Sequence, residues 1–310
     1  MIFDAHTDVL WKLLNDPSID FYEDDDRLHV NYPNMIKGKI DLQVFAIYVS
    51  PTIKSSKFLV AIQSIDDFYQ IVIGQKNRFK LATTYQEIET YLDQDKKVAL
   101  LSIEGADVLE GDLAKLRTFY RLGVRAMGLT WNQANEVADG IMEPRGAGLT
   151  RFGQEVVKEM NRLGMMIDVS HLSERGFWDV IEQSEIPIHA SHSNTKKICN
   201  HPRNLTDGQI KAIIEQGGVI GVTFVRDFTS TNKEPTIDDL LLHIEHIASL
   251  GGIEHIGLGS DFDGANPIKG LENAGKLENL VNVLLKYFAK EHVEGILKQN
   301  WLNYYKRVLR

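Results

Sequence analysis

The amino-acid sequence predicts an α/β fold, a (β/α)8 or TIM barrel that forms a single domain over residues 1–310 and carries extra C-terminal helices. Eight short apolar segments alternate with segments of helical periodicity, and this alternation indicates a parallel sheet. Eight is also the number of strands that closes a barrel of this kind. The chain has 310 residues, of which 43% are hydrophobic, and α/β barrels commonly fill this length as one domain.

The predicted strands are short runs of aliphatic, β-branched or aromatic residues bounded by glycine, proline or polar residues. They are the segment from Met1 toward Asp8 and residues 41–49, 98–103, 123–130, 165–171, 187–192, 219–224 and 255–260. The predicted helices have apolar residues at steps of three and four. They are residues 9–15, 56–77, 85–94, 113–122, 150–163, 173–183, 206–217 and 236–250, with two more C-terminal to these. An open, doubly wound sheet is the alternative, but no glycine-rich phosphate turn follows the first strand.

Composition and charge exclude several classes of function. The net charge is −9, with an acidic run at residues 23–26 that we expect in a solvated loop, so a basic surface for nucleic acid is not predicted. A single cysteine, Cys199, cannot form an internal disulfide and fits a reducing compartment. No apolar run approaches the roughly 18 residues of a membrane span, and Asp4 and His6 interrupt what would be the apolar part of a signal peptide. We therefore expect a cytoplasmic protein without a membrane or nucleic-acid partner.

Side chains that can bind metals follow the apolar runs of five predicted strands. In the first strand, His6 and Asp8 are two residues apart, so both can point to the same side. The carboxyl ends of the strands form one mouth of a barrel, where the side chains that follow them meet. The candidate ligands at these strand ends are His6, Asp8, Glu104, His171, His192 and Asp261. Imidazole and carboxylate suit zinc, manganese or iron, and this set is sufficient for two divalent ions about 3.5–4 Å apart that share a bridging water.

Several of these residues also have a purely structural interpretation. His6 and Asp8 could be polar residues where a strand meets water, and Glu104 could occupy an exposed turn. Asp261 could begin a turn in the sequence Asp-Phe-Asp-Gly. A different pair, His243 and His246, lies three residues apart on a predicted helix. We interpret that pair as part of a solvated helix face.

Seven short motifs occur in one order along most of the chain and carry a resemblance to a known family. They lie at residues 4–8 (DAHTD), 102–106 (SIEGA), 123–130 (GVR through LT), 164–171 (GMMIDVSH), 191–193 (SHS), 202–204 (PRN) and 257–264 (GLGSDFDG). With them the sequence resembles the renal (membrane) dipeptidase family of zinc metallopeptidases, a branch of the metal-dependent amidohydrolase barrels. The motifs are weak singly, but their order makes the resemblance specific.

The resemblance implies a site with two divalent metal ions, expected to be zinc. His6 and Asp8 would bind the first ion, and His171 and His192 would bind the second. Glu104 would bridge the two ions and take part in catalysis. Other amidohydrolase barrels often use a modified lysine as this bridge, so a glutamate on the third predicted strand agrees with the dipeptidase branch.

The resemblance also implies roles for residues around the metals. Asp261, which lies next to the ions and is counted among their candidate ligands, would be the catalytic proton carrier. Arg203 would bind the free carboxylate of the substrate through a bidentate contact, although it could instead cap a loop or pair with a surface acid. Animal members carry a histidine where this chain has Trp131. Either Trp131 or Asn132 would then supply a hydrogen-bond donor to the substrate, or the metal alone would polarise the carbonyl; Trp131 could also be only a pocket wall.

The combined prediction is a metal-dependent dipeptidase that hydrolyses small dipeptides, L-D as well as L-L, through a metal-bridging hydroxide. The first alternative is the same metal site acting on another small amide, lactone or phosphoester. The second alternative is a non-catalytic metal- or ligand-binding protein on the same barrel. Members of the family are commonly dimers, so a homodimer is an expectation of the resemblance alone.

Overall fold

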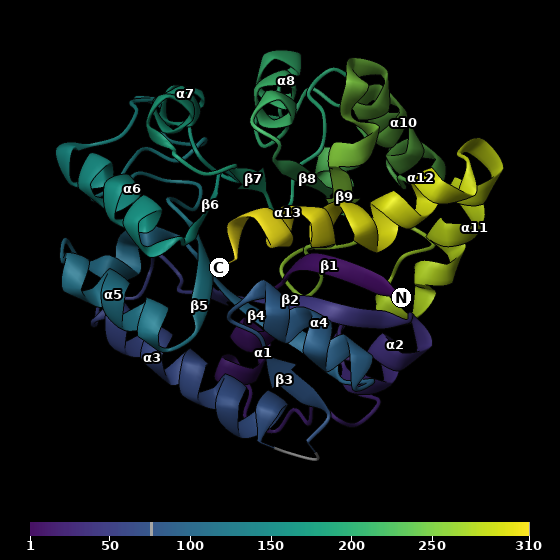
Figure 1. Ribbon diagram of the computed structural model, residues 1–310, viewed down its shortest axis with the longest axis horizontal. Coiled ribbons are helices and arrows are strands. Elements are labelled where there is room, and N and C mark those ends of the chain that lie inside the picture. The colour runs from purple at the N-terminus through teal and green to yellow at the C-terminus, as the bar shows by residue number, and fades with distance from the viewer. Residues whose placement is uncertain (75–76, 310) are drawn as a thin grey trace.

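The chain forms a closed barrel of eight parallel strands, seen in a computed structural model that describes residues 1–74 and 77–309 (Figure 1). The barrel order is β1-β2-β4-β5-β6-β7-β8-β9, and β9 pairs again with β1 to close it. A short additional strand, β3, extends the sheet beside β4. The strands are β1 (Ile2–Thr7), β2 (Ile40–Tyr48), β3 (Phe79–Leu81), β4 (Lys97–Glu104), β5 (Val124–Gly128), β6 (Met166–Asp168), β7 (His189–Ala190), β8 (Val219–Val222) and β9 (Ile256–Leu258).

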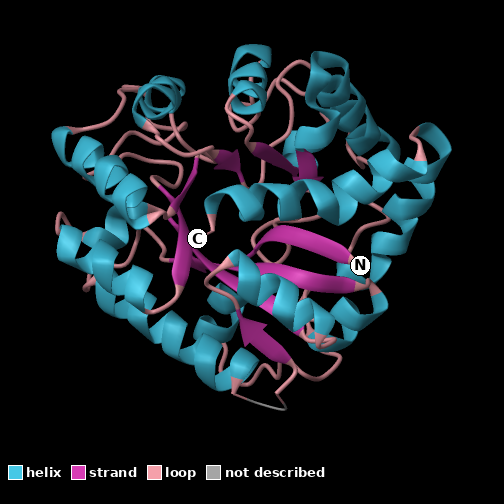
Figure 2. Cartoon of the chain, viewed as in Figure 1, coloured by secondary structure: helices cyan, strands magenta, loops and turns pink. Residues whose placement is uncertain are grey.

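Helices surround the barrel, as the secondary-structure colouring shows (Figure 2). The α-helices are α1 (Val9–Asn15), α2 (Tyr32–Lys37), α3 (Lys57–Asp67), α4 (Tyr85–Asp93), α5 (Leu113–Arg121), α6 (Arg151–Leu163), α7 (Glu174–Gln183), α8 (Asp207–Glu215), α9 (Arg226–Thr229), α10 (Ile237–Ile247), α11 (Leu277–Tyr287), α12 (Lys290–Glu294) and α13 (Asn300–Val308). Short 3-10 and π-helical turns connect or extend several of them. In the part of the chain that the structure describes, no helix is long and apolar enough to cross a membrane.

The predicted barrel is confirmed, and the differences are local. The predicted strand at residues 165–171 is shorter, because β6 ends at Asp168 and His171 lies in the loop that follows it. The predicted helix at residues 56–77 consists of α3 and a π-helical turn that ends at Ile73, and residues 75–76 of that prediction lie outside the described residues. The prediction missed α2, β3 and α9, which have three to six residues each and give little periodic signal.

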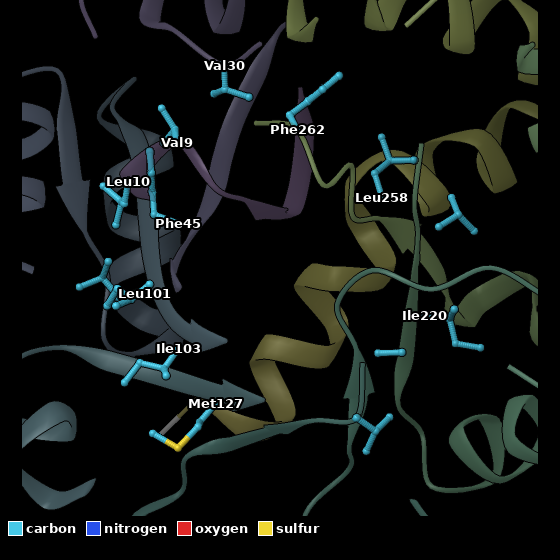
Figure 3. Close-up of a cluster of buried hydrophobic side chains, with 14 of the residues drawn as sticks. Val9, Leu10, Val30, Phe45, Leu101, Ile103, Met127, Ile220, Leu258 and Phe262 are labelled. Atoms are coloured by element: carbon cyan, nitrogen blue, oxygen red, sulfur yellow. The ribbon is translucent and has the colours of Figure 1, made fainter. Parts of the chain in front are cut away.

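Two apolar cores hold the barrel together. The larger core lies between the strands and the surrounding helices, and Figure 3 shows part of it, including Phe45, Leu101 and Met127. The smaller core fills the interior of the barrel and joins Phe3 and other inward-facing strand residues to Trp301 and its neighbours on α13. The last helix therefore closes the end of the barrel opposite its carboxyl-terminal mouth (Figure 1).

Strand periodicity carries the side chains of β4 from this apolar interior to the mouth. Side chains alternate between the two faces of a strand, so Val98, Leu100, Ser102 and Glu104 share one face. Val98 and Leu100 belong to the interior core, and Glu104 is the last residue of the strand. The same alternation that packs the barrel therefore delivers one carboxylate to its carboxyl end.

Polar side chains reinforce the closure between the first and last strands. Asp4 on β1 accepts hydrogen bonds from the backbone N–H of Ser260 (2.8 Å) and from its hydroxyl (2.7 Å). Three residues further along β1, the hydroxyl of Thr7 donates to the carbonyl of Phe262 (3.0 Å). These contacts lock the segment after β9 against the end of β1, and so hold Asp261 beside His6.

Candidate metal centre

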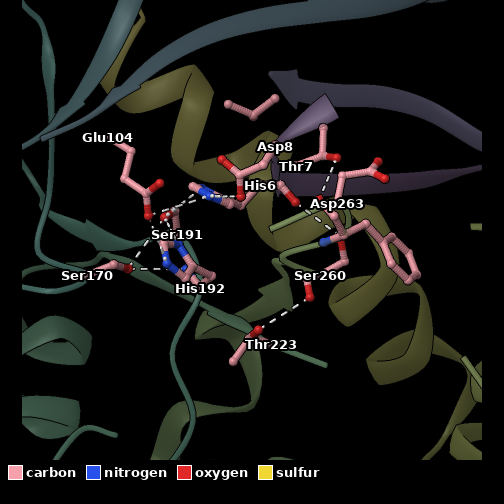
Figure 4. A network of polar contacts seen from close by, with 12 residues as sticks. His6, Thr7, Asp8, Glu104, Ser170, Ser191, His192, Thr223, Ser260 and Asp263 are labelled. Carbon is pink, nitrogen blue, oxygen red and sulfur yellow. Dashed lines mark hydrogen bonds and ion pairs between the residues drawn. The ribbon is translucent and has the colours of Figure 1, made fainter. Parts of the chain in front are cut away.

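Three imidazoles converge on one carboxylate at the mouth of the barrel; Figure 4 labels that carboxylate, Glu104, and two of the imidazoles, His6 and His192. The Oε1 atom of Glu104 lies 2.8 Å from Nε2 of His171, 3.5 Å from Nε2 of His192 and 3.8 Å from Nε2 of His6. All four side chains are at most 8% exposed. The sequence-predicted residues of β1, β4, the loop after β6 and the segment after β7 therefore meet at one point.

Two further carboxylates complete the cluster on the β1 side. Asp8 Oδ2 lies 3.4 Å from His6 Nε2, and candidate ligand atoms of His6, Asp8 and Asp261 all lie within 4.8 Å of one another. Asp261 has a φ of 61° and His171 a φ of 68°. Non-glycine residues seldom adopt this left-handed conformation, and such residues concentrate at functional sites.

The buried atoms of the cluster fit a divalent cation. Within residues 1–74 and 77–309, Nε2 of His6 and Oδ1 of Asp8 are buried without a hydrogen-bond partner, a costly arrangement unless something binds there. Nε2 of His171 faces Nε2 of His192 at 2.9 Å. Two nitrogens that share one zinc ion are separated by about this distance, because each Zn–N bond is about 2 Å.

The electrostatics of the site also favour a cation. Burial opposes protonation of His6, but the carboxylates of Asp8 and Glu104 raise its pKa to about 10. Burial raises the pKa of Asp261 well above its ordinary value, and the Asp8 carboxylate adds to this effect. The clustered carboxylates thus create a negative potential that holds a proton on His6 and would equally attract a metal ion.

The other two imidazoles remain neutral. Burial lowers the pKa of His171 to about 4, with a contribution from the Arg203 guanidinium. Burial and the nearby charge of His6 lower the pKa of His192 well below its ordinary value. A neutral imidazole has the free lone pair that a metal ligand requires.

A pocket of about 290 Å³ opens onto the cluster and offers space for a small substrate. Its polar wall contains Asp8, Glu104, Asn132, His171 and Asp261, and its apolar wall contains Trp11, Tyr48, Trp131, Phe228, Gly264 and Ala265. Trp131 packs with Tyr48 at 5.4 Å between ring centroids. Asn132 Oδ1 lies 2.8 Å from Nδ1 of His171.

Arg203 is buried behind the cluster, 4% exposed, and is not a surface residue. Its Nη2 donates to the carbonyl of His192 (3.3 Å), and its guanidinium carbon lies 5.3 Å from the ring centroid of Phe228. Its Nε is buried and has no partner among the described residues. Arg203 lines a small cavity on the other side of His171, so its guanidinium has unused donor capacity close to the site.

Two polar residues that lie beside the metal cluster, Ser191 and Asp168, were missed by the reasoning from sequence. Ser191 Oγ lies 2.8 Å from Nδ1 of His192 and donates to Asp168 at 2.5 Å. Both residues occur inside motifs that carry the family resemblance, and that was the available signal. Their mutual contact depends on the pairing of β6 with β7, which spacing along the chain does not reveal.

The prediction for His243 was wrong. It is fully buried and not on a solvated face: its Nε2 contacts the carbonyl of Thr229 at 2.7 Å, and its Nδ1 accepts from the backbone of Thr195 at 3.1 Å. His246 is partly exposed and pairs with Asp207. Both histidines satisfy structural contacts away from the mouth.

Comparisons with known proteins find relatives over most or all of the chain. Residues 1–310 match the family described as Membrane dipeptidase (Peptidase family M19). An uncharacterized protein from the pqqA 5′ region of Klebsiella pneumoniae is 35% identical over 251 residues, covering 77% of this chain and 92% of that protein. An uncharacterized dipeptidase of Schizosaccharomyces pombe is 32% identical over 301 residues, covering 90% of this chain and 72% of its own length.

The overall structure is similar to that of a solved enzyme. The crystal structure of a metallo peptidase from Rhodobacter sphaeroides, liganded with a phosphinate mimic of the dipeptide L-Ala-D-Ala, superposes with a TM-score of 0.92 at 28% identity. The superposition covers 99% of each chain. The likeness therefore extends over the barrel and its surrounding helices.

Proposed function

Because the chain belongs to the membrane dipeptidase family, peptidase family M19, and is by that membership a metal-dependent dipeptidase, we propose that two zinc ions bind at the barrel mouth and serve the hydrolysis of small dipeptides. The observation that carries this proposal is the position of Glu104, whose Oε1 lies within 3.8 Å of the Nε2 atoms of His6, His171 and His192. One carboxylate between two ligand groups is the arrangement a bridged pair of ions needs.

Each ion has its own protein ligands in this proposal. His6 and Asp8 bind the first ion, His171 and His192 bind the second, and Glu104 contacts both. When bound, the ions supply Lewis acidity, which makes water a stronger nucleophile at neutral pH and polarises the scissile carbonyl. The buried atoms without partners on His6 and Asp8 support this assignment.

Asp261 is the proposed proton carrier. It lines the pocket, touches the metal cluster through Asp8 and His6, and has a strongly raised pKa. A carboxyl group with a raised pKa can accept a proton from the attacking water and deliver it to the leaving amine nitrogen near neutral pH. The left-handed backbone at Asp261 fixes its carboxyl group over the cluster.

The proposed substrate contacts involve the pocket walls and the buried Arg203 behind the cluster. We assign the free carboxylate of the dipeptide to Arg203, which has a buried, unpartnered Nε. Asn132 uses its Oδ1 toward His171, so its amide N–H2 is the donor available to the substrate carbonyl, and Trp131 forms an apolar wall. The pocket volume suits small residues, and the dipeptide mimic bound by the Rhodobacter sphaeroides enzyme supports acceptance of a D-residue at the second position.

The decisive experiment combines metal analysis with a panel of L-L and L-D dipeptides. We expect about two zinc ions per chain, and we expect His171→Ala and His192→Ala to lose both zinc and hydrolysis. His246→Ala, on an outer helix, is the matched control and should retain both. Full activity with full zinc content in either site variant would overturn the ligand assignment.

A second measurement tests the substrate class. Conversion of the substrate carboxylate to an amide should lower kcat/KM by at least about tenfold, because a buried cation would lose its charged partner. If amidation has no effect, then Arg203 does not bind that group and another small amide, lactone or phosphoester becomes the better substrate.

We also propose a reducing, cytoplasmic compartment, on the basis of the single cysteine. We further propose a homodimer, which sedimentation would test.

A further inference from the structure

Below the metal cluster, Asp168 at the end of β6 receives an unusual number of donors. Its Oδ1 accepts the backbone N–H of Ser170 (3.0 Å) and of Ser191 (2.9 Å), and its Oδ2 accepts the hydroxyl of Ser191 (2.5 Å). Burial opposes ionisation of Asp168, but the three hydrogen bonds donated by Ser170 and Ser191 favour the carboxylate and keep its pKa below its ordinary value. Asp168 is therefore a carboxylate, which can only accept hydrogen bonds.

This fixes the direction of the Ser191 hydroxyl. A serine has one hydroxyl proton and two lone pairs, and the proton of Ser191 is committed to Asp168. The Oγ atom can then only accept from its other neighbours. The nearest of these is Nδ1 of His192 at 2.8 Å.

The consequence for His192 is a defined tautomer. Its Nδ1 must carry the proton that Ser191 accepts, so its Nε2 has a free lone pair. That Nε2 is the atom that faces Glu104 and His171 in the cluster. Nδ1 of His6 also approaches the same hydroxyl oxygen, at 3.5 Å, while Nε2 of His6 lies 3.4 Å from Asp8 Oδ2 and 3.8 Å from Glu104 Oε1. The contacts around Ser191 are drawn in Figure 4.

The third imidazole does not use Ser191. Nδ1 of His171 lies 2.8 Å from the Asn132 side-chain oxygen, in the loop after β5. This oxygen can accept the Nδ1 proton of His171, as Ser191 does for His192. Ser191 therefore lies under one ligand of each proposed ion, whereas Asn132 supports only one ligand.

We propose that Ser191 is a positioning residue for both metal positions, because its hydroxyl, oriented by Asp168, holds His192 and His6 with their Nε2 lone pairs directed at the ions. This inference rests on the proposed two-metal function and adds to it the device that prepares the ligands. Groups that orient metal-binding histidines typically contribute a factor of about 10–100 to metal affinity.

Two substitutions separate this role from simple packing. Ser191→Ala removes the acceptor and should weaken zinc binding about 10–100-fold in competition with a chromophoric chelator. Ser193→Ala is the matched control: Ser193 is equally buried, two residues further along, and its hydroxyl has no partner within the described residues. The control should bind zinc as the unmodified protein does.

Asp168→Asn gives the sharper result, because it preserves shape and reverses the hydrogen-bond direction. The new amide N–H2 would donate to Ser191, whose proton would then turn toward Nδ1 of His192. His192 would carry its proton on Nε2, toward the ion. We expect a greater loss of zinc affinity than in Ser191→Ala, although fewer atoms are removed.

The tautomer can be read directly in the metal-free full-length chain by two-bond 1H–15N NMR of 15N-labelled histidine. The expected result is Nδ1–H for His192 in the unmodified protein, a mixture in Ser191→Ala and Nε2–H in Asp168→Asn. Excess zinc should restore hydrolysis in Ser191→Ala, which a folding defect would not allow. An unchanged tautomer in both variants, or an equal affinity loss in Ser193→Ala, would overturn the proposal. Failure of the unmodified chain to bind zinc would instead contradict the proposed function, while the tautomer result would stand.

Discussion

The two ends of the barrel are equally buried but differ in how their polar atoms are satisfied. At the closed end, Trp301 Nε1 donates to the carbonyl of Leu258 (3.1 Å), and the Tyr304 hydroxyl donates to that of Pro187 (3.0 Å). At the mouth, Nε2 of His6 and Oδ1 of Asp8 have no hydrogen-bond partner among residues 1–74 and 77–309. The closed end is complete by itself, whereas the mouth is complete only when a ligand is present.

This difference shows which end stabilises the fold and which end performs chemistry. Large apolar side chains with satisfied polar atoms contribute to folding free energy. Buried ionisable groups of like charge, such as Asp8 and Asp261, oppose folding and are retained for function. Substitutions at the two ends should therefore separate activity from stability.

The largest expected effect is on activity at the mouth. Glu104→Gln removes the carboxylate that is proposed to contact both ions. It should lower dipeptide hydrolysis by more than about 100-fold, a greater loss than is typical for residues that only orient metal ligands. The melting temperature of the metal-free chain should change little, because Asp8 and Asp261 lose a repulsive neighbour while His6 and Arg203 lose an attractive one. Substantial activity in this variant would contradict a bridging role for Glu104.

The matching change at the closed end should affect stability alone. Trp301→Ala leaves a large cavity against Phe3 and should cost about 3–5 kcal/mol of unfolding free energy. Denaturant titration measures the loss, and kcat/KM per folded molecule should be unchanged. A selective fall in kcat/KM without loss of stability would show that the two ends are not independent.

Two glycines permit the same comparison with one added methyl group. A Cβ at Gly264 would lie 2.1 Å from Asp8 Oδ2 and 2.4 Å from Asp261 Oδ1, whereas a Cβ at Gly257 would lie 2.1 Å from the indole nitrogen of Trp301. Gly264→Ala should displace site carboxylates and reduce activity and zinc affinity. Gly257→Ala should destabilise the fold by about 1–3 kcal/mol through overpacking. Reversed outcomes would contradict the division between the two ends.

The last prediction concerns the pH dependence of metal binding, where the effect per pH unit is moderate. The raised pKa of His6 means that its imidazole carries a proton below about pH 10 when no metal is bound. A metal ion must displace that proton, so zinc affinity should rise by about tenfold per pH unit between pH 6 and 8 for one proton released. Calorimetry in buffers of different ionisation enthalpy measures the release. No release at pH 7 would show that His6 is already neutral.

The barrel could be predicted because each of its eight strands lies in an apolar run that alternates with a segment of helical periodicity, even where the strand itself has only two or three residues. The strand β3 could not, because Phe79–Leu81 is three residues long and gains its identity only by pairing with β4. For the site, the position of Glu104 at the end of a predicted strand placed it with its partners, since strand ends in a barrel converge. The burial of His243 and the contact between Ser191 and Asp168 depend on which elements become neighbours in space, and local pattern does not encode that.

The hydrogen bonds between Asp4 and Ser260 join positions 256 residues apart in the sequence. During synthesis His6 and Asp8 leave the ribosome early, but Asp261 and the segment that locks against β1 are made only after most of the chain. A nascent chain that ends before β9 cannot gather the cluster, so hydrolytic capacity arises only once the polypeptide is nearly complete. In the proposed metal site, binding of both ions would therefore follow closure of the barrel.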